Sequence, residues 1–127
     1  MMPGNLINKI LLFIILNLTL ISSNLNAENK EGNKVIIGAL NKITAKFYDF
    51  EINVGNSMKF GTLDIKIIKC IKRPPEEIPE DFVLIKIIEN TGINKKNTIF
   101  SGWMLSSSPS LSALEHSSYD IWVKKCM

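Results

Sequence analysis

Residues 47–54 alternate between apolar and polar side chains, and this period of two constrains the fold more than any other feature of the chain. An extended backbone places successive side chains on opposite faces, so the apolar residues of this segment share one face. These residues are Tyr48, Phe50, Ile52 and Val54. Gly55 and Asn56 follow and tolerate positive φ, which predicts a hairpin into 57–60. The segment is therefore predicted to be a half-buried strand.

Other segments have the composition of strands, namely 62–72, 82–89, 98–105 and 118–126. In the first of these the alternation slips at Ile67 and Ile68, which indicates a β-bulge or a strand covered on both faces. The segment 82–89 is almost continuously apolar, which is typical of a central strand.

Two other segments break the strand pattern. Residues 73–81 contain three prolines, which cannot donate to a strand ladder, so a rigid acidic loop is expected there. Ser108 can cap a helix and Pro109 suits its first position, with Ser112 as an alternative cap, so a short helix is expected over 109–116. Many short strands with one short helix predict an all-β fold, a small sandwich or partly closed barrel of about six or seven strands.

The start of the chain resembles an export signal. Residues 10–21 are apolar apart from Asn17 and Thr19, and small polar residues follow as far as Ala27. This order predicts a secretory signal peptide cut after Ala27, or alternatively after Ser23. An uncleaved anchor is the other interpretation, but crossing a bilayer takes about 20 apolar residues. We therefore expect a periplasmic or secreted bacterial protein with a signal peptide over 1–27, a flexible lead-in over 28–38 and a single β-rich domain over 39–127.

Charge and composition limit the partners. The net charge is only +3 and the lysines are scattered, so the chain has no basic stripe for nucleic acid. His116 is the only histidine, which excludes a metal site with two imidazoles, and no cofactor is expected. The partner is expected to be an envelope protein or glycan, and the membrane is expected to be met only through the export signal.

The two cysteines, Cys70 and Cys126, are expected to form a disulfide. An exported chain with an even number of cysteines favours a disulfide, and two cysteines allow a single pairing. Two independent buried thiols are the alternative. The absence of a Cys-x-x-Cys spacing argues against a redox-active pair.

Three groups of residues could carry chemistry. His116 with Glu115, Asp120 and nearby serines suggests a hydrolase, but no Gly-x-Ser-x-Gly motif is present. The acidic residues of the proline loop could supply paired carboxylates, although a solvated loop is favoured; they are Glu76, Glu77, Glu80 and Asp81. The aromatic residues near the C-terminus could form a sugar-stacking platform, although core packing is favoured; they are Phe100, Trp103, Tyr119 and Trp122.

The run from Phe100 to Cys126 resembles the signature of a bacterial family catalogued as domain of unknown function 2155. The resemblance extends to 39–45, to 60–63 and to Cys70 with the proline loop that follows it. It departs from the family pattern at Leu105, Ser106 and Ser117. The family implies an exported protein with no established activity, so it supplies no catalytic residues. The residues that resemble family positions, and that could form a binding site or a structural motif, are Cys70, Trp103, Ser107, Ser108, Pro109, Leu114, Glu115, His116, Tyr119, Asp120, Trp122 and Cys126.

These observations favour a non-catalytic binding or envelope-associated accessory protein. The alternatives are a hydrolase acting on envelope glycan or peptide through His116 and nearby carboxylates, and a structural subunit of a membrane complex. The surroundings of His116 discriminate between them, because an exposed His116 in a cleft beside a carboxylate would favour the hydrolase and a packed His116 would exclude it.

Overall fold

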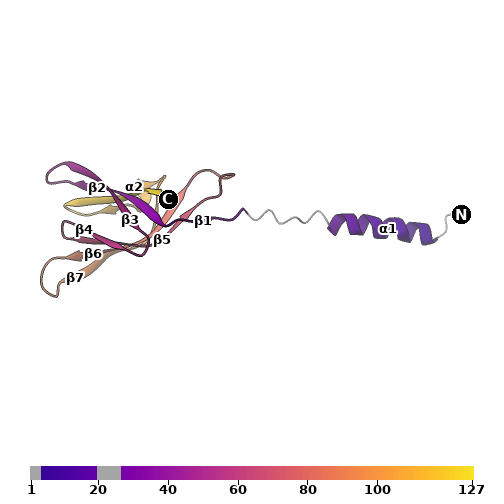
Figure 1. The fold of residues 1–127 in the computed structure, drawn as a ribbon, viewed down its shortest axis with the longest axis horizontal. Coiled ribbons are helices and arrows are strands. Elements are labelled where there is room, and N and C mark those ends of the chain that lie inside the picture. Colours follow the sequence, from indigo (N-terminus) through magenta and orange to yellow (C-terminus); the bar gives the residue numbers. More distant parts are fainter. Residues whose placement is uncertain (1–3, 20–26) are drawn as a thin grey trace.

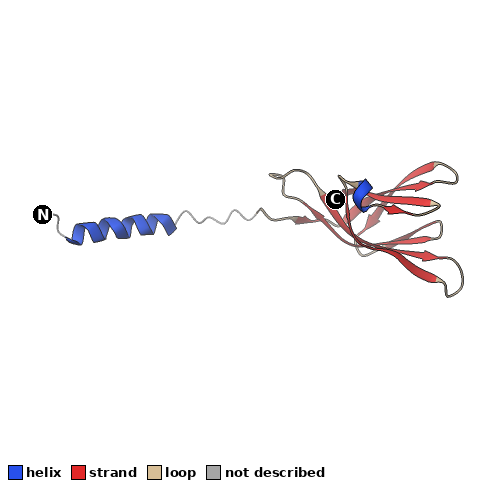
Figure 2. Cartoon of the chain, turned by 180° about the vertical axis from the view of Figure 1, so that it is seen from behind, coloured by secondary structure: helices blue, strands red, loops and turns tan. Residues whose placement is uncertain are grey.

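The computed structural model describes residues 4–19 and 27–127, and within them the strands form two stacked antiparallel sheets (Figures 1 and 2). The five-stranded sheet has the order β1-β5-β6-β7, with β4 also pairing with β5, and the four-stranded sheet has the order β3-β2-β9-β8. The strands are β1 Lys30–Glu31, β2 Lys34–Asn41, β3 Lys46–Asn53, β4 Ser57–Phe60, β5 Leu63–Lys72, β6 Asp81–Asn90, β7 Lys96–Leu105, β8 Leu114–Glu115 and β9 Tyr119–Cys126. The expected all-β class is confirmed, as a sandwich and not a closed barrel.

The core lies between the sheets and takes every second residue of the main strands. β5, β6 and β9 each alternate buried with more exposed positions over most of their length. The largest wholly buried side chains are Val35, Ile37, Leu63, Ile65, Ile67, Cys70, Val83, Ile85, Ile87, Met104, Ile121 and Val123. The alternation expected for 47–54 is confirmed in β3, where Ile52 is buried and Phe50 packs against the core.

Two expectations for the five-stranded sheet are confirmed. The register of β5 against β6 shifts between Ile67 and Lys69, which is the bulge expected where the alternation slips. β6 is central, with β5 on one side and β7 on the other.

The structure differs from the flexible lead-in expected over 28–38. Lys34–Asn41 forms β2, which lies between β3 and β9, and Val35 and Ile37 are wholly buried. Even Glu31 belongs to a strand, because β1 pairs with the end of β5. The polar composition of 28–34 suggested a loose segment, whereas the apolar residues from Val35 onward need a covered face and obtain one in the middle of a sheet.

The helix expected over 109–116 is a single turn, α2, Pro109–Ser112. The backbone of Ala113 is extended, and Leu114 and Glu115 pair with Ile121 and Asp120 as strand β8. Sheet pairing, which buries Leu114, therefore ends the helix. Ser108 occupies the position before the helix, as expected, but its hydroxyl makes no capping hydrogen bond. The side chain of Leu111 lies outside the described part of the chain.

The apolar run near the start forms helix α1, Gly4–Thr19, whose side chains are all exposed. The alternative cleavage point after Ser23 lies outside the described residues. Within residues 4–19 and 27–127, no helix is long and apolar enough to span a bilayer.

Candidate functional site

A disulfide joins the two sheets at the end where the C-terminus lies (Figure 1). Cys70 of β5 and Cys126 of β9 have Cα atoms 5.9 Å apart, which meets the geometric requirement for the expected pairing. Gly32 packs directly on this bond, and a Cβ at that position would collide with both sulfur atoms. The N–H of Gly32 donates to the carbonyl of Cys70 at 2.9 Å, so the segment between β1 and β2 is held against the bond.

Glu80 lies at the same end and is buried, with 7% of its surface exposed. The expectation of a solvated acidic loop is therefore wrong for this residue. Its carboxylate accepts hydrogen bonds from the hydroxyls of Ser106 and Ser107 and from the N–H groups of Ser107 and Asp81. These donors tie the proline loop to the residues that follow β7, which gives the motif residue Ser107 a structural role.

The hydrogen bonds also set the charge state of Glu80. Burial by itself raises the pKa of a carboxyl group because it penalises the charged form. Here the bonds from Ser107, Ser106 and the Asp81 N–H outweigh burial, so the pKa of Glu80 is lowered from its ordinary value of 4.5. Asp81 continues the network, since its Oδ2 accepts the N–H of Cys126 at 2.9 Å. The two acids thus fasten the loop, β7 and β9 together.

His116 is held at both ring nitrogens. Its Nε2 lies 2.7 Å from Oε1 of Glu89 on β6, and its Nδ1 accepts the backbone N–H of Ser118 at 3.0 Å. An acceptor Nδ1 fixes the neutral tautomer that carries its proton on Nε2, so Nε2 donates to Glu89. The ring also stacks on Tyr119, with centroids 5.5 Å apart.

The hydrolase arrangement is not assembled around this histidine. Neither ring nitrogen is free to take a proton from a nucleophile, which general-base catalysis requires. Asp120, one of the expected carboxylates, lies 2.8 Å from the amine of Lys42, and that amine also donates to the His116 carbonyl at 2.8 Å. Glu115 is exposed. Within the described residues, no group of three or more His, Cys, Asp or Glu side chains is placed to hold a metal ion.

The C-terminal aromatic residues do not form a shared platform. Phe100 and Tyr119 pack against the core, and Tyr119 contacts Phe60 at 5.2 Å between ring centroids. Trp122 of β9 covers Gly38 of β2, where a Cβ would collide with the indole ring. Core or sheet packing therefore accounts for these residues, and Trp103 differs from them.

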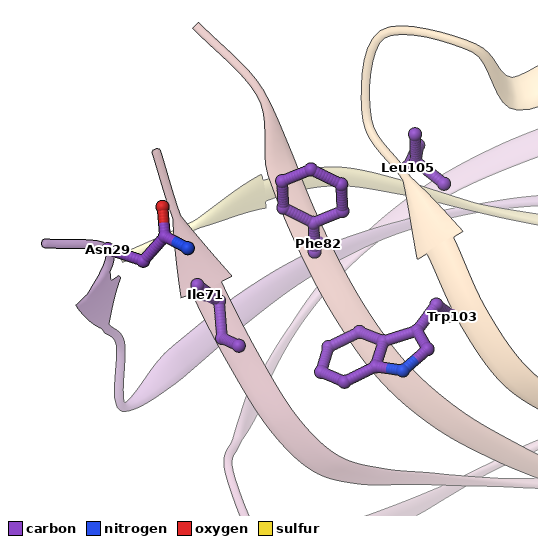
Figure 3. Close-up of a pocket in the computed structure, with 5 residues that line it drawn as sticks. All are labelled: Asn29, Ile71, Phe82, Trp103 and Leu105. Atoms are coloured by element: carbon purple, nitrogen blue, oxygen red, sulfur yellow. The ribbon is translucent and has the colours of Figure 1, made fainter. Parts of the chain in front are cut away.

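Trp103 lies on the outer face of the five-stranded sheet, with 42% of its surface exposed. It lines an open groove of about 440 Å³ together with Asn29, Ile71, Phe82 and Leu105 (Figure 3). Figure 3 shows the indole reaching from β7 across β6 toward Ile71, with Phe82 beside it. The guanidinium of Arg73 lies 5.4 Å from the centroid of the Phe82 ring. Aromatic and aliphatic side chains thus line a concave surface that solvent reaches.

Sequence reasoning identified Trp103 but missed the other groove residues and Glu89. A signal for the groove existed in the nearly continuous apolar run of β6, because one apolar face of that strand covers the core and the other must be exposed when no second layer covers it. For Glu89 the local sequence carries no comparable signal, since only the pairing of the sheets brings it to His116.

Comparison with known proteins agrees with the motif resemblance. A family model described as "Uncharacterized protein conserved in bacteria (DUF2155)" matches residues 35–126. "Uncharacterized protein RP359" of Rickettsia prowazekii (strain Madrid E) is 38% identical over 99 residues, which cover 78% of this chain. The matched region spans 63% of that relative's length. No solved structure matches the chain.

Proposed function

Since the chain belongs to the family of uncharacterised conserved bacterial proteins DUF2155, we propose that it is an exported envelope protein that works by binding, through the groove at Trp103, without catalysing a reaction. The observation that carries the proposal is the exposed apolar groove on the outer face of the five-stranded sheet. Exposed apolar patches of this kind, with an aromatic residue at the centre, are typical of interaction sites.

Export is supported by the order of residues at the start of the chain. An apolar run, a stretch of small polar residues and a charged segment follow one another before the folded domain begins. The disulfide between Cys70 and Cys126 agrees with this, because such bonds persist in oxidising compartments.

A binding role is favoured over hydrolysis by the surroundings of His116. Its two ring nitrogens serve Glu89 and Ser118, and these contacts fasten the corner before β9 to β6. The carboxylate of Glu80 likewise accepts its hydrogen bonds from Ser106 and Ser107 of the same chain. The groove, in contrast, presents apolar side chains to solvent, and Trp103 keeps 42% of its surface exposed there.

The proposal is tested by photo-crosslinking in intact cells that produce the full-length chain. A benzophenone amino acid replaces Leu105 in the groove, and a matched chain carries it at Phe47, which is exposed on the four-stranded sheet. We expect a discrete adduct from position 105 and none from position 47. Adding Trp103→Ala to the chain labelled at position 105 is expected to abolish the adduct, because it removes the largest side chain of the groove.

Two outcomes would contradict the proposal. One is equal labelling from positions 105 and 47, which indicates random collisions. The other is an adduct at position 105 that persists unchanged with Trp103→Ala, which places the contact outside the groove.

A further inference from the structure

Two lysines face each other beside the groove without an acidic partner. Lys66 of β5 and Lys86 of β6 are directly paired in the sheet, and both point outward because their neighbours Ile65, Ile67 and Ile85 are wholly buried. In the described part of the chain, none of the ion pairs involves either lysine. Like charges directly opposite each other in a sheet repel, so this pair favours a bound anion.

The outer face of the five-stranded sheet carries more positive than negative side chains. Strand alternation and register place six cations on this face or at its rim, and they are Lys59, Lys66, Lys69, Arg73, Lys86 and Lys96. They place two acids there, Glu31, which pairs with Lys69, and Asp64. The face thus has an excess of four positive charges in a chain whose net charge is +3, so the rest of the molecule is close to neutral. Arg73 belongs to the proline loop but is included because its guanidinium lies over the Phe82 ring, whereas Glu76 and Glu77 lie further along that loop, beyond the sheet.

The positive residues adjoin the apolar ones along the same strands. Lys86 pairs with Ser101, and two residues further along Leu84 pairs with Trp103, so the two rows are about 7 Å apart. Ile71, Phe82 and Leu105 form the next row. Ile68 at the bulge of β5 is exposed as well. A ligand that covers this face must therefore present anionic groups to Lys66 and Lys86 and apolar groups to the adjoining row that contains Trp103.

We infer that the outer face of the five-stranded sheet docks on the surface of a membrane that contains anionic phospholipid, with Trp103 at the level of the interface and Lys66 and Lys86 against the headgroup phosphates. This deepens the proposed function by naming what the groove binds, and it goes beyond an export signal as the sole membrane contact. Tryptophan is enriched at membrane interfaces, and lysines near an anionic leaflet add attraction within a Debye length. Because the groove is open to solvent, it suits contact with a broad surface better than enclosure of a small ligand.

The test uses the purified domain, residues 28–127, after confirmation that it is folded, because this part contains both sheets and the disulfide. It is mixed with vesicles of phosphatidylcholine alone or with 30% phosphatidylglycerol, a composition of about one anionic lipid in three. Binding is measured by co-sedimentation. In a Trp122→Phe background Trp103 is the only tryptophan, so its emission is expected to shift to the blue on anionic vesicles and to be quenched by brominated acyl chains.

Charge reversal and truncation identify the face. Lys66→Glu with Lys86→Glu is expected to weaken binding at least tenfold, since each lysine near the surface contributes about 1 kcal/mol of attraction. The matched control is Lys46→Glu with Lys125→Glu, which changes the net charge equally at exposed positions of the other sheet. Trp103→Ala is also expected to weaken binding, whereas Phe47→Ala on the other sheet is not.

The inference is overturned if the domain does not bind anionic vesicles, if it binds neutral vesicles equally well, or if the control reversals weaken binding as much as those at Lys66 and Lys86. Failure here is distinguishable from failure of the proposed function. Without vesicle binding, a Trp103-dependent adduct at position 105 that contains a polypeptide would leave the groove as a binding site and assign it to a protein partner.

Discussion

At the scale of single residues, Glu80 shows how a buried charge can organise a loop that sequence composition presents as solvent-exposed. Its carboxylate has four donors, which come from Asp81, Ser106 and Ser107. Charge-assisted hydrogen bonds of this kind favour the ionised form and hold the donors in one geometry. The proline loop is therefore anchored at its end, where β6 begins, and the pKa of Glu80 is lowered as a result.

Glu80→Gln is expected to reduce the free energy of unfolding at pH 7 by about 1–3 kcal/mol, because one carboxylate oxygen becomes an amide NH₂ group, which cannot accept the hydrogen bonds that this oxygen accepts. Since the pKa is lower in the folded state, the stabilisation from Glu80 is present above its ordinary pKa of 4.5 and is lost as the pH falls through the folded value. Urea unfolding at pH 7 and below pH 4.5 should show a smaller loss on acidification in the variant. Glu77→Gln, at an exposed position of the same loop, is the control. Identical pH dependence in both variants would contradict this role.

At the scale of elements, strands with a local signal could be predicted and strands defined by their partners could not. The alternation in 47–54 and the slip at Ile67 and Ile68 each led to an observed feature. β2 and β8 were missed because their pairing with β9 makes them strands, and that partner lies far along the chain from β2. The candidate site follows the same rule, since Trp103 was visible in the sequence but its neighbours Ile71 and Phe82 come from other strands.

Leu114→Ala is expected to destabilise the domain by about 2–5 kcal/mol, because Leu114 is buried against the core and pairs with Ile121. The corner that contains α2 and β8 is then a fixed element and not a moving lid. Thermal or urea unfolding measures the effect, with Ile93→Ala, at a fully accessible loop position, as the control. An unchanged unfolding curve for Leu114→Ala would show that β8 is not docked.

Cys126→Ser is expected to lower the free energy of unfolding by about 2–5 kcal/mol, since the bond closes a loop with a sequence separation of 56. Amide exchange should increase first at the C-terminal end of β9, which the bond holds against β5. Cys70→Ser is expected to cost the same, and the double variant no more than either alone, because all three lack the same bond. Additive losses would indicate that the two thiols act separately.

At the scale of the whole molecule, the two sheets present different outer surfaces. The five-stranded sheet has the groove and the excess of positive charge, whereas on the four-stranded sheet Lys34 and Lys124 are paired with Glu51 and Asp49. Two lysines of the four-stranded sheet are thus paired within the chain, whereas Lys66 and Lys86 on the other sheet take part in none of the ion pairs of the described residues.

Export predicts the residue at which the mature protein begins. Protein recovered from the bacterial envelope is expected to begin near Glu28, or near Asn24 if the alternative cleavage point is used, because signal peptides are removed after small residues. N-terminal sequencing of the fractionated protein is the measurement. Folded protein in the cytosol that retains Met1 would contradict export.

The bond between Cys70 and Cys126 also makes the chain between them a covalent ring. The turn between β6 and β7 lies within this ring, and Ile93 in this turn is 93% exposed, which makes it an accessible place for a protease. A cut there separates Phe82 from Trp103 along the backbone, yet both pieces stay linked through sulfur. The nicked protein would migrate as one species on a gel until thiol is added, and the two halves of the groove would not come apart.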